Sequence, residues 1–241
     1  SRTDWYSGPT LLEILETLPV ADDPGHEDFR FPVQLTLRPQ GAACDVAHRE
    51  YRGYAGQIAS GLVRVGDEVV VLPSGRRTTI AGIDTADGEL AEAFAPRSVS
   101  LRLTDDIDVA RGDLIAAASS APEPTRDLVA TVCWLSDAPL SKRGRVLLKH
   151  TTRTTRAVIS AVNGILDLDA VKIVPAEDLV LNDIGRLRIR TADPIAAEPY
   201  ARHRRTGAFL LIDPQSGQTL AAGMLGDPLA GEGDHADEWD I

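Results

Sequence analysis

The chain has 241 residues, of which 43% are hydrophobic, and it carries a formal net charge of −11. This length allows one large or two small domains, and no apolar run approaches the roughly 20 residues that a membrane helix requires. The negative charge repels nucleic acid at long range, and two cysteines without metal-type spacing favour a reducing compartment. The composition therefore argues against membrane and nucleic-acid partners and favours a cytoplasmic protein.

The first predicted element is a short helix close to the start of the chain. Leucines at 11–18 share one helical face, and they follow Gly8-Pro9, where proline suits a first helical position. Pro19 and a polar run end this pattern. We therefore expect residues 1–27 to be a linker that contains one helix.

The stretch 51–75 alternates glycines with short β-forming runs. Gly56, Gly61 and Gly66 lie five residues apart, and glycine turns the chain through positive φ at little cost. Branched side chains between them suit a pleated sheet. This pattern predicts a compact antiparallel barrel at residues 28–118. Its expected strands are 31–37, 57–65, 68–72, 76–83, 98–103 and 113–117, with a polar loop at 38–50.

The remainder of the chain repeats this organisation. Residues 119–126 are a small-residue and proline run that predicts a linker, and residues 127–225 predict a second barrel. Closure of each sheet removes exposed strand edges, so two closed barrels are the economical arrangement. Residues 226–241 carry acidic residues without Lys or Arg, which predicts a disordered tail. The strands expected in the second barrel are 128–135, 145–150, 154–162, 170–173, 183–190 and 207–213.

The side chains with catalytic or metal-binding chemistry form no recognisable constellation. The five histidines are scattered without metal-ligand spacing, and Cys133 lies in an apolar strand, where a thiol is inert. His203 belongs to the run 202–205, for which we favour a solvated basic turn. The acidic run 105–108 could suggest a cation site, but we expect a turn into the last strand of the first barrel. We expect no catalytic, cofactor or metal site in this chain.

Basic residues gather in one segment of this acidic chain. Residues 142–156 contain six Lys and Arg residues and no acidic one. A solvated face and a docking surface for an acidic partner or phosphate are both open interpretations. The candidate interface residues, which include positions in the first barrel and in the run 202–205, are Arg52, Tyr54, Lys142, Arg143, Arg145, Arg153, Arg156, Arg202, Arg204 and Arg205.

Several motifs occur in an order that resembles one protein family. They are WYSGPTLLE at 5–13, RGYAGQIASG at 52–61, VGDEV at 65–69, LNDIGR at 181–186 and TGAFLLID at 206–213. Together they resemble the large, GTP-binding subunit of bacterial sulfate adenylyltransferase, in the elongation-factor-Tu-like superfamily of translational GTPases. The resemblance covers nearly the whole chain. It implies an all-β fold of two consecutive antiparallel β-barrels of the translation-factor type.

The motifs that bind GTP in that superfamily are missing here. Gly56–Gly61 is followed by Leu62-Val63 instead of Lys-Ser/Thr, and neither Asn163 nor Asn182 precedes lysine. We therefore expect a fragment that begins after the GTPase domain and holds no cofactor, with GTP and Mg²⁺ implied for that other domain.

The function that the resemblance implies is non-catalytic. The parent subunit would couple GTP hydrolysis to ATP-dependent adenylylation of sulfate by a separate catalytic small subunit. The implied partners are that small subunit, the chain's own GTPase domain and, in some relatives, a fused adenylyl-sulfate kinase domain. A translation-factor-like module that binds tRNA or the ribosome remains the alternative.

Overall fold

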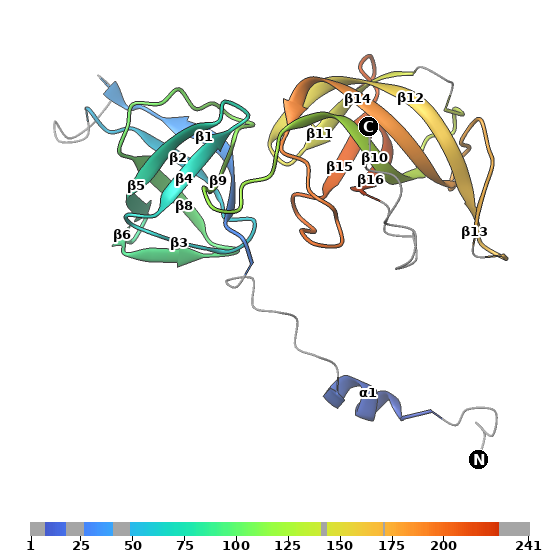
Figure 1. Ribbon diagram of the computed structural model, residues 1–241, viewed down its shortest axis with the longest axis horizontal. Coiled ribbons are helices and arrows are strands. Elements are labelled where there is room, and N and C mark those ends of the chain that lie inside the picture. The colour runs from blue at the N-terminus through green and yellow to red at the C-terminus, as the bar shows by residue number, and fades with distance from the viewer. Residues whose placement is uncertain (1–7, 18–26, 41–48, 141–143, 171, 227–241) are drawn as a thin grey trace.

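The computed structural model describes residues 8–17, 27–40, 49–140, 144–170 and 172–226. It contains two β-barrels side by side and one helix, α1 (Leu11–Thr17), that lies apart from them (Figure 1). The helix begins with a capping box, in which the Thr10 amide donates to the Glu13 carboxylate at 2.6 Å and the Glu13 amide donates to the Thr10 hydroxyl at 3.2 Å. The predicted linker helix is thus present, while positions 1–7 and 18–26 lie outside the described residues.

The first barrel is a ring of six antiparallel strands. The ring order is β4-β9-β1-β2-β8-β5, closed by the pairing of β4 with β5, while β6 extends β5 and β3 pairs with β7. Its core includes Phe31, Ile80, Leu101 and Ile115, all at most 1% exposed. The strands are β1 (Arg30–Leu37), β2 (Gly53–Gln57), β3 (Leu62–Arg64), β4 (Glu68–Leu72), β5 (Arg76–Thr85), β6 (Gly88–Leu90), β7 (Glu92–Phe94), β8 (Ser98–Leu103) and β9 (Leu114–Ala117).

The regularly spaced glycines of the first barrel have two different roles. Gly61 and Gly66 have φ of 76° and 96°, as their turns require. Gly56 lies within β2, where a Cβ would come within 2.6 Å of the Pro32 carbonyl oxygen of β1. The expected single strand at 57–65 is therefore wrong: β2 ends at Gln57 and β3 begins only after the Gly61 turn.

The second barrel is also a closed ring of six strands. Its order is β11-β15-β16-β10-β14-β12, closed by the pairing of β11 with β12, and β13 extends β12. Buried Leu148, Ile159, Leu187 and Leu211 fill it. The strands are β10 (Thr125–Trp134), β11 (Arg145–His150), β12 (Arg153–Asp167), β13 (Lys172–Val174), β14 (Ile184–Ile195), β15 (Ala208–Ile212) and β16 (Thr219–Leu225).

Four strands of the second barrel differ clearly from the expectation. β10 begins at Thr125, within the expected linker 119–126, and β16 was not predicted. β12 and β14 both continue beyond their expected ends at 162 and 190. The predicted fold class of two consecutive antiparallel β-barrels is confirmed. No helix among the described residues is both long enough and apolar enough to cross a membrane. Residues 227–241 lie outside the described part of the chain.

Candidate functional site

A buried ion pair joins the two barrels. Arg30 of β1 is 1% exposed, and its guanidinium donates to the Glu198 carboxylate at 2.8–3.1 Å. The same guanidinium donates to the Phe29 carbonyl at 2.9 Å and to the Ser120 carbonyl at 2.6 Å. Glu198 also accepts from the Thr206 hydroxyl at 2.7 Å. Both charges are therefore compensated away from water, which is the condition for a buried pair to be tolerated.

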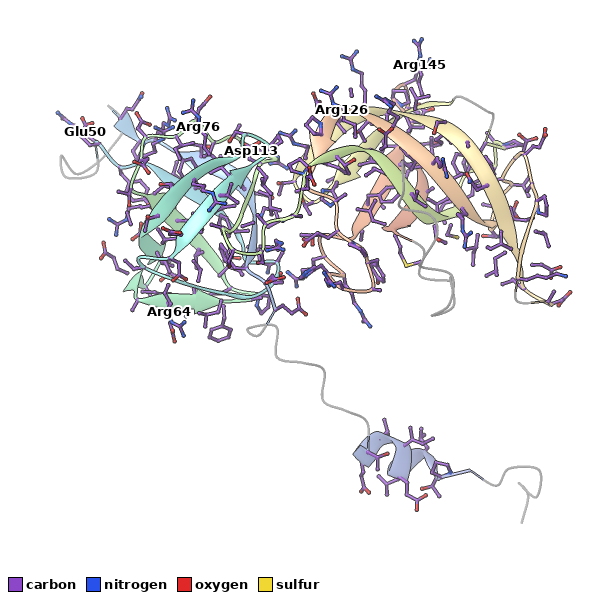
Figure 2. All side chains as sticks on the ribbon, in the orientation of Figure 1. Glu50, Arg64, Arg76, Asp113, Arg126 and Arg145 are labelled. Carbon is purple, nitrogen blue, oxygen red and sulfur yellow. The ribbon has the colours of Figure 1, made fainter. Side chains whose placement is uncertain are left out.

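Further contacts extend this junction across both barrels. Arg153 donates to the Gly112 carbonyl at 3.1 Å and to the Asp113 carboxylate at 2.9 Å, and Arg205 donates to Gln57 at 2.9 Å. Figure 2 shows Asp113 on the side of the first barrel that faces the second. An apolar cluster completes the junction and consists of Val70, Leu72, Leu114, Ala116 and, from the second barrel, Ala196. The proposed partner residue Arg153 thus already contacts the first barrel.

The basic run 202–205 is not the fully solvated turn that we expected. His203 is 4% exposed, and its Nε2 lies 3.4 Å from a Glu198 carboxylate oxygen. Arg202, Arg204 and Arg205 are exposed around it. Three of the four side chains therefore remain accessible, while the histidine belongs to the junction.

His203 also contacts the segment that enters the first barrel. Its ring nitrogens lie 3.9 Å from a Glu27 carboxylate oxygen and 3.8 Å from an Asp28 carboxylate oxygen. Glu27 and Asp28 immediately precede Phe29 and β1. The second barrel therefore contacts the first barrel's entering chain as well as its strands.

His150 makes folding stability depend on pH. Its Nε2 donates to the Thr206 carbonyl at 2.6 Å, and burial lowers its pKa below the ordinary value of 6.5. As the pH falls, His150 is therefore protonated in the unfolded chain while it stays neutral in the folded chain. Its contribution to the free energy of unfolding is complete above about pH 6.5 and is lost at lower pH. We expect this residue to lower the free energy of unfolding by up to about 1.4 kcal/mol per pH unit as the pH falls below about 6.5. In urea titrations at several pH values, His150→Gln should weaken the dependence of the free energy of unfolding on pH. An unchanged pH dependence would contradict the role assigned to His150.

Two candidate interface residues of the first barrel hold the segment around Ile107 in place instead. Tyr54 is 1% exposed, and its hydroxyl donates to the Ile107 carbonyl at 2.9 Å. Arg52 donates to the same carbonyl at 2.5 Å, pairs with Asp106 and lies 5.8 Å above the Tyr54 ring. These contacts hold the acidic run 105–108 against β2, and the turn that leads into β9 lies after it, where the Asp113 amide donates to the Ala110 carbonyl at 3.1 Å. Tyr54 is a core residue in this structure and does not line a surface.

Metal-binding chemistry has no centre within the described ranges. There, no group of three or more His, Cys, Asp or Glu side chains is arranged to hold a metal ion. The carboxylate of Asp105 in the acidic run accepts from the Thr78 hydroxyl at 2.8 Å. Hydrogen bonding within the barrel thus accounts for this carboxylate.

A groove on the outer face of the first barrel is lined by both apolar and polar side chains. It encloses about 1190 Å³ and lies over β1, β2, β5 and β8. In it the Tyr51 hydroxyl donates to Asp84 at 2.8 Å, while Arg102 donates to Asp84 at 2.9 Å and to Glu89 at 2.7 Å. Burial raises the pKa of Tyr51. Because these polar side chains pair with one another, the groove presents no strong net charge to a ligand.

The outer face of the second barrel collects cations from three adjacent strands. Arg145 of β11 lies opposite Val158 of β12, which lies opposite Arg190 of β14. Figure 2 shows Arg145 projecting from the outer side of this barrel. The exposed residues Arg145, Lys149, Arg156, Arg188 and Arg190 are called the basic face below.

Sequence reasoning found only part of the basic face. Arg145 and Arg156 were among the candidate residues, whereas Arg188 and Arg190 join them through strand register alone. Lys142 and Arg143 lie outside the described residues. Arg190 pairs with exposed Asp127 of β10 at 3.0 Å. The face remains strongly basic in a chain whose net charge is −11.

Comparison with known proteins gives relatives along nearly the whole chain. Residues 127–226 match the family described as GTP-eEF1A C-terminal domain-like. The bifunctional enzyme CysN/CysC of Mycobacterium tuberculosis is 46% identical over 93% of this chain and 36% of its own length. Sulfate adenylyltransferase subunit 1 of Alteromonas mediterranea is 36% identical over 97% of this chain and 48% of its own length. The chain thus spans less than half of these relatives.

The solved structure of sup35 complexed with GMPPNP shares the fold. It superimposes with a TM-score of 0.72 at 21% sequence identity, covering 92% of this chain and 52% of that chain. This similarity shows that the two chains share a fold. The assignment to a family rests on the relatives found by sequence. The chain belongs to the family of sulfate adenylyltransferase subunit 1 and the CysN/CysC enzymes, and its two domains are β-barrels of the translation-factor type.

Proposed function

We propose that this chain is the non-catalytic β-barrel part of a sulfate adenylyltransferase large subunit acting in the cytoplasm. The observation that carries the proposal is the 46% identity along 93% of the chain to the Mycobacterium tuberculosis enzyme. GTP and Mg²⁺ would bind in another domain of the same protein. Hydrolysis there would be coupled to adenylylation of sulfate by ATP, which forms adenylyl sulfate and pyrophosphate on a separate catalytic small subunit.

The barrels would act as a rigid relay in this coupling. The buried Arg30–Glu198 pair and the Arg153–Asp113 pair connect them at separate points, so a force on one barrel is transmitted to the other. The basic face lies on the outer side of the second barrel and suits an acidic surface of the small subunit. Charge complementarity of this kind mainly raises the association rate.

The helix α1 supplies a second surface, for the GTPase domain. Leu11, Leu12 and Leu15 are 58–73% exposed, and a helix of seven residues is unstable in water without tertiary packing. We propose that these leucines pack on the GTPase domain of the same protein. A fused adenylyl-sulfate kinase domain is the further partner that we propose for the bifunctional members of the family.

Reversing two charges of the basic face tests the proposed function. Arg145→Glu with Arg156→Glu should slow association with the purified catalytic small subunit about tenfold at low salt, because reversal replaces attraction by repulsion. The difference should shrink as salt is raised, since the Debye length falls to about 8 Å at physiological ionic strength. Stopped-flow fluorescence over a salt series measures both effects.

The matched control makes the same charge change on the first barrel. Arg76 and Arg77 are exposed on β5, so Arg76→Glu with Arg77→Glu alters net charge equally away from the basic face. This variant should associate nearly as fast as the parent chain. Equal rates for all three proteins would remove the basic face from the interface. Salt-dependent binding to tRNA, with none to the small subunit, would instead favour the translation-factor-like alternative.

A further inference from the structure

The basic face and the last residues of the chain carry opposite charges. Residues 227–241 contain six acidic residues and no Lys or Arg. The basic face contributes five positive charges on three adjacent strands. At physiological salt, exposed opposite charges attract over roughly a Debye length, about 8 Å. The two groups would therefore attract each other if the chain can bring them together.

The described chain ends beside the basic face, at the residue before this acidic segment. The Gly226 amide donates to the Val129 carbonyl of β10 at 2.9 Å, and Val129 lies directly opposite Arg188 of β14. Gly226, the last residue that the structure describes, therefore lies one strand away from the face. Adjacent strands are about 4.8 Å apart, so β11 lies about 15 Å from β10 across the sheet. An extended chain reaches about 3.3 Å per residue, so even half of 227–241 covers this distance.

The cations of the face are available to such a ligand. Within the described residues, Arg145, Lys149, Arg156 and Arg188 have no acidic side chain in ion-pair contact. The remaining member, Arg190, pairs with Asp127, but both side chains are about two-thirds exposed, and such pairs contribute about 0–1 kcal/mol. The face can therefore accept carboxylates without breaking a strong internal interaction.

The face also offers apolar area between its charges. Val158 is 38% exposed beside Arg145 and Arg190, and Leu210 is 37% exposed beside Lys149. The acidic segment contains Trp239 near its end, and an indole can stack on a guanidinium as well as on aliphatic carbons. Alternation of cations and small apolar patches thus matches a ligand that mixes carboxylates with a few large apolar side chains.

We propose that residues 227–241 bind the basic face of their own chain, as a tethered acidic ligand that competes with any external acidic partner. The proposal does not depend on the identity of that partner. A short tether gives an effective concentration in the millimolar range, so even a weak contact is well populated in the intact chain. The segment would then set a threshold that an acidic partner has to exceed before it occupies the face.

A peptide with the sequence of residues 227–241 tests the proposal in competition. Fluorescently labelled peptide is titrated with the full chain and with a full-length variant whose six acidic residues at 227–241 are replaced by Asn or Gln. The neutralised variant should bind the peptide on the order of tenfold more tightly, because its face is vacant. Fluorescence anisotropy at low and high salt gives both dissociation constants, and the difference should shrink with salt.

Two further variants locate the binding site. In the neutralised background, Arg156→Glu with Arg188→Glu should abolish peptide binding, whereas Arg76→Glu with Arg77→Glu should leave it nearly unchanged. Thermal unfolding confirms that each variant is folded. The proposal is overturned if the full chain and the neutralised variant bind equally, if neither binds, or if both pairs of reversals weaken binding alike. These outcomes leave the proposed function untouched, because the small subunit takes no part.

Discussion

Glu198→Ala is expected to lower the free energy of unfolding by about 3–5 kcal/mol. The substitution leaves the Arg30 guanidinium, whose side chain is 2% exposed, buried without its carboxylate. The Thr206 hydroxyl loses its acceptor as well. Urea denaturation followed by circular dichroism measures the change, and the midpoint should shift strongly without loss of β-signal in the absence of urea.

An exposed pair in the same barrel provides the control. Asp127→Ala removes the partner of Arg190, where the two side chains are 66% and 68% exposed, so the expected loss is only about 0–1 kcal/mol. Replacing Arg30 by Met and Glu198 by Leu together should recover much of the loss, since no charge then remains buried. Similar small effects of Glu198→Ala and Asp127→Ala would show that the junction contributes little to stability.

Gly61→Ala is the second substitution with a large expected effect. The backbone of Gly61 has φ of 76°, which costs an L-residue about 1–3 kcal/mol. An added Cβ would also lie 2.5 Å from the Phe29 amide nitrogen and 2.6 Å from the Glu27 carbonyl oxygen. Displacing these backbone atoms should cost about 1–3 kcal/mol more. Urea titration should therefore show a loss of about 2–6 kcal/mol in total.

Gly75→Ala separates the two contributions. Gly75 has φ of 72°, close to that of Gly61, but an added Cβ would meet nothing within 4 Å. Its substitution should cost only the conformational part, about 1–3 kcal/mol, without the further cost of displaced backbone atoms. If Gly61→Ala and Gly75→Ala lowered the free energy of unfolding equally, the close approach of residues 27–29 to Gly61 would make no contribution to the cost.

Local patterns were sufficient to predict most strands and the two-barrel fold. Alternation along β8 and the branched run of β4 are properties of neighbouring residues, and tertiary packing reinforced them. β16 was not predicted because its sequence, TLAAGML, is rich in small residues with weak strand preference. Gly223 in that strand lies beneath Phe209, whose ring would be 2.2 Å from a Cβ. The Phe209 ring of the neighbouring strand β15 thus explains why position 223 has no side chain.

The candidate site could be predicted only where it is local in sequence. Arg145 and Arg156 share one hairpin and stood out as a basic segment, whereas Arg188 reaches them through a register that shifts between Ile159 and Ala161. The partner of Arg30 lies 168 residues away, and no periodicity signals such a pairing. Tyr54 was misassigned because the sequence predicted no strand at 53–56, where β2 places this side chain in the barrel core.

The contact of His203 with Glu27 and Asp28 has a mechanical consequence. The chain enters the first barrel over a loop of the second, so any displacement transmitted through Glu27 acts on both barrels at one anchorage. Because the Arg30–Glu198 and Arg153–Asp113 pairs also link the barrels, we expect a displacement at residue 27 to move the two barrels together.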